Sequence, residues 1–219
     1  MVRVFIAEDQ EIVRLGLKMA LPRTGQVEVV GEADNGTSAM EKIAACRPSV
    51  VLLDLDLPGQ DGIETTRAIK QQLPETRVVI FTGHTDDRRL FDALEAGADA
   101  YVVKTSDIDK LLTAIQTVMQ GAIWLDPAVG TKVVRASTNR HAAPQQPKSQ
   151  PKEQLDFLSE REKEIVKMIA NGLGNQAIAH QLYLSIDTVK THIRNIMEKM
   201  EANNRTEAAV KAIKLGMVV

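Results

Sequence analysis

The first 120 residues alternate short apolar runs with helical stretches. Five runs are rich in Val, Ile and Leu: VRVFIA, VEVVGEA, SVVLLDL, RVVIFTG and AYVVK. Nearly continuous apolar runs of this length are typical of parallel strands buried on both faces. In the stretch 106–119, which follows the fifth run, apolar side chains recur on one helical face. Five strand–helix repeats predict an α/β fold, a doubly wound five-stranded parallel sheet with right-handed crossovers.

Residues 155–219 follow a wholly helical pattern. Ser159 and Glu162 form a capping box ahead of a helix with periodic apolar residues, which closes at Asn171–Gly172. Further helices are expected at about 175–182, at about 186–200 after a cap at Ser185, and after a cap at Asn204. The pattern predicts an all-α domain of four helices.

The segment between these two regions has a different composition. Residues 120–136 indicate a short connecting helix or an extended segment, with Trp124 as a packing residue. Residues 137–154 are rich in Pro, Gln and Ser and have almost no large apolar side chain, so burial cannot offset the entropy of ordering them. We therefore expect a first domain at 1–120, a connecting segment and flexible linker at 121–154, and a second domain at 155–219.

Composition and charge narrow the class of protein. The chain is 44% hydrophobic and 26% charged, which is ordinary for a soluble globular protein. It has no apolar run near the length of a membrane helix, its start MVRVFIAED lacks the pattern of a signal peptide, and its single cysteine, Cys46, can form no intramolecular disulfide. We therefore expect a cytoplasmic protein with no membrane partner.

The net charge of −2 conceals an asymmetry. Residues 1–125 contain 13 Lys and Arg against 19 Asp and Glu, whereas residues 126–219 contain 14 against 10. This favours a phosphate-bearing partner for the second half only. The signal is weak, because residues 155–219 alone contain 9 against 8.

Polar residues follow the predicted strands of the first domain. Glu8 and Asp9 follow the first strand, Asp54 the third, Thr82 ends the fourth, and Lys104 follows the fifth. If the first and third strands are neighbours, three carboxylates meet in one cleft, and their mutual repulsion favours a hard divalent cation such as Mg²⁺. A lysine and a hydroxyl beside them suit an incoming phosphoryl group. The alternative, acids scattered over a surface turn, does not account for polar residues at four strand ends.

Four blocks in this region resemble the signature of response-regulator receiver domains. They are EDQ (8–10), LLDLDLPGQDG (52–62), VVIFTGH (78–84) and YVVKTS (101–106). The resemblance spans residues 1 to about 120 and implies a flavodoxin-like fold. It also implies that Asp54 is the phosphoacceptor and that Mg²⁺ is held by Glu8, Asp9, Asp54 and the backbone carbonyl of Asp56.

The same resemblance assigns the phosphoryl-binding and switch residues. Lys104 would pair with the phosphoryl group, and Thr82 would move toward it and let Tyr101 turn inward. Gly83 leaves room for the group. Two departures should be tolerated. The acidic pair is Glu-Asp where Asp-Asp is also common, and position 56 is an aspartate, of which only the backbone carbonyl is required.

The predicted helix 186–200 has two distinct faces. Val189, Ile193, Ile196 and Met200 form one apolar stripe, and the opposite face presents Lys190, Thr191, Arg194 and Glu198. With the short helix before it, this stretch suits a helix-turn-helix that inserts into the major groove of DNA. Charge alone would favour the alternative, an amphipathic surface helix with solvated lysines.

Residues 158–218 closely resemble the LuxR-type module of the NarL/FixJ family. By that resemblance Lys190, Thr191 and Arg194 face bases, while Ser185, Thr188, His192 and Lys199 lie nearer the phosphates. His192 is equally well explained as a packed, partly buried histidine. The short helix that precedes 186–200 departs from the family at Gly174–Ala177. Gln176 there can hydrogen-bond a phosphate but brings no charge, which lowers the nonspecific affinity for DNA.

The resemblance implies a phosphorylation-dependent transcription regulator rather than an enzyme. Its partners would be a sensor histidine kinase, double-stranded DNA and a second copy of the chain when phosphorylated, with RNA polymerase as a further candidate. The alternative is a phosphorelay or protein-interaction adaptor whose last domain binds protein. The cations at 190 and 194 argue against the adaptor.

Overall fold

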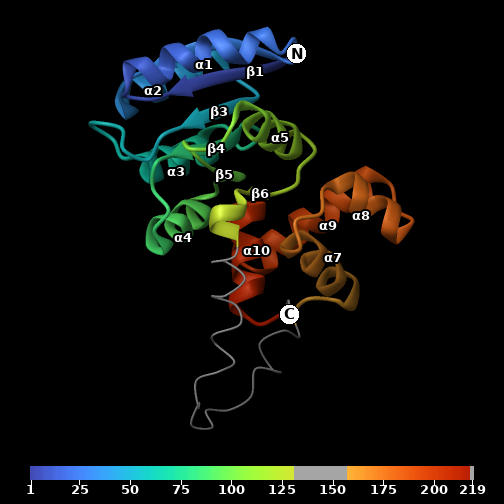
Figure 1. The fold of residues 1–219 in the computed structure, drawn as a ribbon. Helices are drawn as coiled ribbons and strands as arrows, with labels where there is room; N and C mark the ends of the chain where they lie inside the picture. Colours follow the sequence, from blue (N-terminus) through green and yellow to red (C-terminus); the bar gives the residue numbers. More distant parts are fainter. Residues whose placement is uncertain (131–156, 218–219) are drawn as a thin grey trace.

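A computed structural model of the chain describes residues 1–130 and 157–217 (Figure 1). The strands are β1 (Val2–Ala7), β2 (Val27–Ala33), β3 (Val50–Leu53), β4 (Arg77–Thr82), β5 (Ala100–Val103) and β6 (Trp124–Leu125). The helices of the same part are α1 (Glu11–Arg23), α2 (Gly36–Cys46), α3 (Gly62–Gln72), α4 (Asp87–Ala96) and α5 (Ile108–Met119). All five predicted strand–helix repeats are present.

The strands form one parallel sheet in the order β2-β1-β3-β4-β5-β6. Helices α1 and α5 bury one face of it, and α2, α3 and α4 bury the other. The predicted doubly wound α/β fold is thus confirmed. Because β1 lies beside β3, the carboxyl ends of β1, β3 and β4 lie side by side, where ligands bind in open α/β sheets.

The prediction of five strands is wrong by one. Trp124 and Leu125 form β6 at the sheet edge, paired in parallel with Ala100 and Tyr101. A strand of two residues has no apolar run that a sequence pattern can detect, and it depends on pairing with β5. The expected packing role of Trp124 is confirmed, since its side chain contacts the apolar core under α1 and α5.

The second described part is helical. It contains α7 (Glu160–Ala170), α8 (Asn175–Leu182), α9 (Ile186–Lys199) and α10 (Arg205–Lys214). The predicted capping box is present, because Ser159 Oγ accepts from the backbone N–H of Glu162 at 3.3 Å and Glu162 Oε2 accepts from that of Ser159 at 2.7 Å. The four predicted helices are confirmed around one apolar core.

The two parts are in contact through their helices. Val210 of α10 belongs to the apolar cluster that contains Leu90 and Leu94 of α4. Gly97 ends α4 at a φ of 107°, and a Cβ built on it would lie only 2.5 Å from Asn204 Nδ2. A glycine is therefore needed at this approach of α4 to the start of α10.

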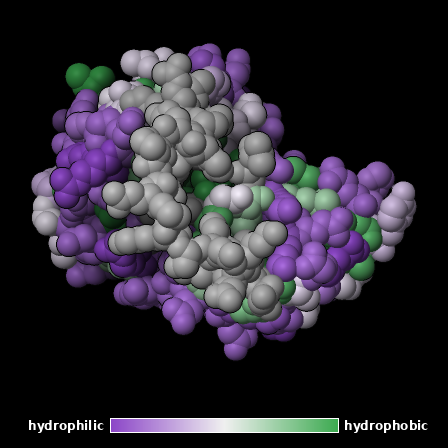
Figure 2. All heavy atoms as spheres, turned by 90° about the horizontal axis from the view of Figure 1, so that it is seen from below, coloured by the Kyte–Doolittle hydropathy of each residue, from purple (hydrophilic) through white to green (hydrophobic). Residues whose placement is uncertain are grey.

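The predicted linker at 137–154 lies outside the described residues, so the domain boundaries remain predictions. Within 1–130 and 157–217, no helix is both long and apolar enough to cross a membrane. The described surface seen in Figure 2 is mostly hydrophilic, with hydrophobic side chains gathered in small patches.

Candidate functional site

The acidic residues predicted at the strand ends are brought together. Glu8 and Asp54 follow the neighbouring strands β1 and β3, and each is only 1% exposed. Asp9 is exposed beside them, and one carboxylate oxygen from each of the three lies within 4.8 Å of the others. The register explains this, since the backbone N–H of Asp54 donates to the carbonyl of Ala7 at 2.9 Å.

Lys104 bridges two of these acids. Its Nζ lies 2.7 Å from Glu8 Oε1 and 2.7 Å from Asp54 Oδ2. The other oxygens of the same carboxylates, Glu8 Oε2 and Asp54 Oδ1, are buried without a hydrogen-bond partner among the described residues. The site therefore has two buried acceptor atoms available to a cation.

The electrostatics of the cluster follow from this crowding. Burial and the nearby charge of Asp54 raise the pKa of Glu8, although the hydrogen bond from Lys104 acts to lower it. Burial acts to lower the pKa of Lys104, but its bonds to Asp54 and Glu8 prevail and raise the pKa. The ammonium group is thus held charged, and one cation faces two buried carboxylates.

The predicted switch residues line the same edge of the sheet. Thr82 at the end of β4 is fully buried, and Gly83 follows it with no atom within 4 Å of an added Cβ. Tyr101 already lies inward in this structure, fully buried, with its hydroxyl donating to the carbonyl of His84 at 3.1 Å. Burial raises the pKa of Tyr101 well above its ordinary value.

His84 and Arg89, which the sequence did not single out, join this site through Asp56. Asp56 Oδ2 lies 2.5 Å from His84 Nε2, and Asp56 Oδ1 lies 2.5 Å from Arg89 Nη1. Burial would raise the pKa of Asp56, but the hydrogen bonds from Arg89 and His84 lower it. Arg89 belongs to α4, so these contacts tie that helix to the loop after Asp54.

The two predicted faces of α9 are confirmed. Val189 and Ile196 are fully buried, and Ile193 and Met200 are 7% exposed. On the other face Lys190, Thr191, Arg194 and Glu198 are all exposed. The helix therefore presents two cations and a hydroxyl on one solvent-facing surface.

The residues expected near phosphates have mixed environments. Ser185 Oγ caps α9 by accepting from the N–H of Thr188 at 3.1 Å. Gln176 is exposed and His192 is half-buried. Lys199 Nζ lies 2.8 Å from Glu162 Oε2, so its charge is partly neutralised by an ion pair within the helical part.

Each of the two parts of the chain matches a known protein family. The family model of the response regulator receiver domain matches residues 4–116, and that of the bacterial regulatory proteins of the luxR family matches residues 156–212. The chain is a LuxR-type response regulator. Proteins of this family are transcription regulators that bind DNA, not enzymes, and the response regulator described here is one of them.

Two relatives match this response regulator over almost its whole length, and a third matches part of it. Response regulator protein VraR of Staphylococcus aureus (strain Mu3 / ATCC 700698) is 33% identical over 217 residues, 99% of each chain. The crystal structure of response regulator ChrA, from a heme-sensing two-component system, is 32% identical with a TM-score of 0.51 and covers 99% of this chain and 98% of ChrA. A LuxR-family response regulator from Aurantimonas sp. SI85-9A1 is 33% identical with a TM-score of 0.60, covering 63% of this chain and 99% of its own.

The pair Glu162–Lys199 should make the helical part of this response regulator sensitive to acid. Burial acts to raise the pKa of Glu162, but bonds from Lys199 and Ser159 outweigh it and hold the pKa below its ordinary value of 4.5. An acid with a depressed folded-state pKa adds stability that is fully present above the unfolded value and is lost as pH falls through the folded value. Amide hydrogen exchange of α7 and α9 should therefore accelerate as pH falls below about 4.5, after correction for intrinsic rates.

The variant Glu162→Gln should lose this pH-dependent part of the protection. Glu164→Gln, on the exposed side of the same helix, is the matched control and should retain it. Equal acid sensitivity of the two variants would contradict the assignment.

Proposed function

We propose that Asp54 accepts a phosphoryl group from a sensor histidine kinase, and that this modification controls the binding of α9 to DNA. The observation that carries the proposal is the position of Asp54, buried between Glu8, Asp9 and Lys104 at the carboxyl edge of the sheet. A carboxylate oxygen of Asp54 attacks phosphorus, the bond from phosphorus to the kinase histidine breaks, and an acyl phosphate forms.

The acidic residues fit a magnesium ion. Receiver domains typically bind Mg²⁺ at such a site, and here Glu8 Oε2 and Asp54 Oδ1 are buried acceptors that still need a partner. Glu8, Asp9, Asp54 and the backbone carbonyl of Asp56 would hold it. When bound, Mg²⁺ neutralises charge on the transferring phosphoryl oxygens.

The remaining residues of the site act on the modified aspartate. Lys104 pairs with the phosphoryl oxygens, and Thr82 moves to bond one of them beside Gly83. Tyr101, which is already buried inward, packs behind the threonine. Because Arg89 and His84 contact Asp56, movement of this loop is transmitted to α4, and through α4 to α10.

Helix α9 is the element proposed to read double-stranded DNA. Lys190, Thr191 and Arg194 face the bases, and these residues lie nearer the phosphates: Ser185, Thr188, His192, Lys199 and Gln176. A homodimer places two copies of α9 on two half-sites, which raises the effective affinity. Contact with RNA polymerase is a further part of the proposal.

The experiment that tests this function compares two states of the full chain. The protein is treated with acetyl phosphate and Mg²⁺, and its affinity for DNA selected from a random pool is measured at one salt concentration. Phosphorylation should tighten binding by roughly 5–150-fold, the usual range of coupling between two sites, and should favour a dimer. Equal affinity of the two states, with both monomeric, would contradict the proposal.

Arg194→Ala should flatten the preference of the protein for its operator over random DNA. A side chain that reads bases contributes about 1–3 kcal/mol of discrimination, whereas a phosphate contact weakens all sequences alike. Gln176→Ala is the matched comparison and should weaken both DNAs equally. If Arg194→Ala also lowers both affinities equally, the base-reading face has been misassigned.

A further inference from the structure

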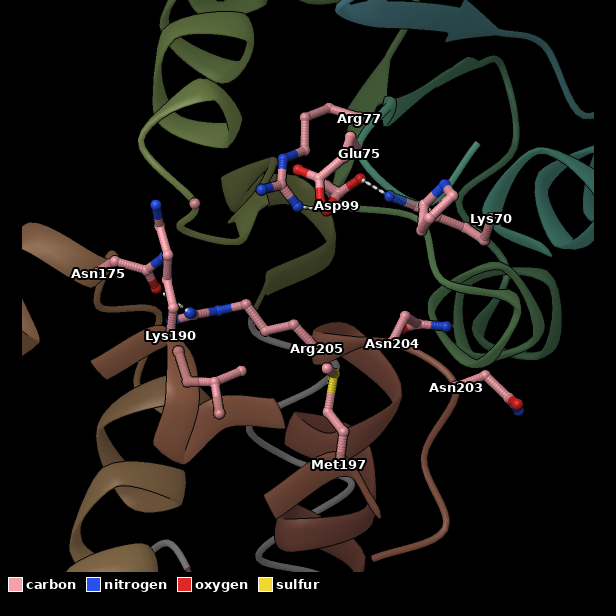
Figure 3. Close-up of a pocket in the computed structure, with 13 residues that line it drawn as sticks. Lys70, Glu75, Arg77, Asp99, Asn175, Lys190, Met197, Asn203, Asn204 and Arg205 are labelled. Atoms are coloured by element: carbon pink, nitrogen blue, oxygen red, sulfur yellow. Dashed lines mark hydrogen bonds and ion pairs between the residues drawn. The ribbon is translucent and has the colours of Figure 1, made fainter. Parts of the chain in front are cut away.

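A cavity of about 200 Å³ lies between the sheet domain and the helical domain (Figure 3). Its charged lining residues come from both parts and are Lys70, Glu75, Arg77, Asp99, Lys190 and Arg205. Four of these are cations and two are acids. The cavity therefore has an excess of positive charge.

One of the two acids is already shared by two cations. Asp99 Oδ2 accepts from Lys70 Nζ at 2.5 Å, and Asp99 Oδ1 accepts from Arg77 Nη1 at 3.2 Å. The same carboxylate also accepts from the backbone N–H of Val78 at 2.8 Å. The other acid, Glu75, is exposed. Asp99 thus has little capacity left to neutralise a third cation.

Arg205 is that third cation. Its guanidinium group donates to two neutral acceptors, Asn175 Oδ1 at 2.6 Å and the carbonyl of Leu173. Its Nε is buried and has no hydrogen-bond partner among the described residues. Burial, with the nearby charge of Arg77, lowers the pKa of Arg205 to about 10. A buried cation with an unused donor and no carboxylate is poorly compensated.

We propose that this cavity binds a small oxyanion of the phosphate class, held by Arg205, Arg77 and Lys190. Planar guanidinium groups match phosphate oxygens with paired hydrogen bonds, and an ammonium group adds a mobile point charge. The amide of Asn175 lines the same space. A water molecule takes about 30 Å³, so a cavity of about 200 Å³ has room for a phosphate ion together with water.

The proposed ligand has a regulatory consequence. It contacts both domains, so by linkage it stabilises the arrangement in which the helical domain lies against the sheet domain. Lys190 cannot hold the anion and a base at once, so the anion opposes DNA binding; this step alone rests on the proposed function. The coupling is reciprocal, and DNA lowers the affinity for the anion by the same factor.

The test uses the full chain without Mg²⁺, so that phosphate is not drawn to the acidic site. Inorganic phosphate is titrated by calorimetry at constant ionic strength kept with chloride, and glycerol 3-phosphate forms a second arm that distinguishes a free from an organic phosphate. Saturable binding of about one equivalent in either arm is expected. Arg205→Met should weaken it at least tenfold, whereas Arg88→Met, which removes a side chain that is 92% exposed on α4, should leave it unchanged.

Arg77→Met supplies a second variant should Arg205→Met not fold, and it should weaken binding likewise. Heats no larger than those of chloride, or equal binding by the variants of Arg205 and Arg88, would overturn the site. DNA affinity measured with and without phosphate at equal ionic strength tests the consequence separately. Anion binding that leaves DNA affinity unchanged would overturn the regulation, and loss of all DNA binding would count against the proposed function and not against the cavity.

Discussion

Replacing Asp54 with asparagine is expected to abolish phosphoryl transfer to this response regulator. The amide has nearly the shape of the carboxylate but lacks the nucleophilic oxygen and the charge that a cation and Lys104 need. Incubation with labelled acetyl phosphate and Mg²⁺, followed by mass mapping, should give full labelling of the wild-type chain and no labelling of Asp54→Asn. Chelation of the metal should suppress labelling of the wild-type chain.

The matched control is Asp109→Asn, an exposed aspartate in the first turn of α5, which should retain full labelling. Thermal unfolding of both variants shows whether either is misfolded. Labelling of Asp54→Asn at the level of the control would show that Asp54 is not the phosphoacceptor. Labelling that is unchanged by chelation would show that phosphoryl transfer does not need the metal.

Asp99→Asn is expected to lower the free energy of unfolding by about 3–5 kcal/mol, the usual effect of breaking a buried ion pair. The side chains of Lys70 and Asp99 are only 6% and 8% exposed. An amide oxygen in the place of Oδ2 can still accept from the backbone N–H of Val78 and from Lys70 Nζ, but the Lys70 ammonium is left buried with neutral acceptors only, this oxygen and the carbonyl of Thr76. The fluorescence of Trp124, the single tryptophan, follows unfolding of this domain because its backbone N–H bonds to the carbonyl of Asp99.

The pH dependence of this variant has a definite sign. Burial already holds the pKa of Lys70 below 10.5, and loss of Asp99 lowers this pKa further. The unfolded chain then binds more protons than the folded one between the two pKa values, so stability rises with pH in that window. The difference in free energy of unfolding between the wild-type chain and Asp99→Asn should therefore shrink as pH approaches 10.5.

Two further variants make this expectation specific. Adding Lys70→Met to Asp99→Asn removes the uncompensated charge and should restore much of the stability. Asp92→Ala, on the exposed side of α4, should change stability by no more than about 0.5 kcal/mol. A loss in Asp99→Asn no larger than that of Asp92→Ala would mean that the pair contributes little.

The sequence by itself determined the features that depend on local pattern. Continuous apolar runs predicted β1 to β5, because strands buried on both faces need apolar side chains at every position. It also placed Glu8, Asp54 and Lys104 at one edge, because parallel strands end on the same side of a sheet. The capping box at Ser159 follows from the Ser-x-x-Glu motif, and the buried stripe of α9 follows from helical periodicity.

Only the tertiary structure decided which distant residues meet. It added β6, which exists through pairing with β5, and it joined Lys70 to Asp99, Asp56 to Arg89 and Glu162 to Lys199. The members of these pairs lie 29, 33 and 37 residues apart in the chain. No local periodicity encodes such contacts, because each depends on how separate helices and strands pack. The cationic cavity around Arg205 is the strongest case, since neither domain forms it alone.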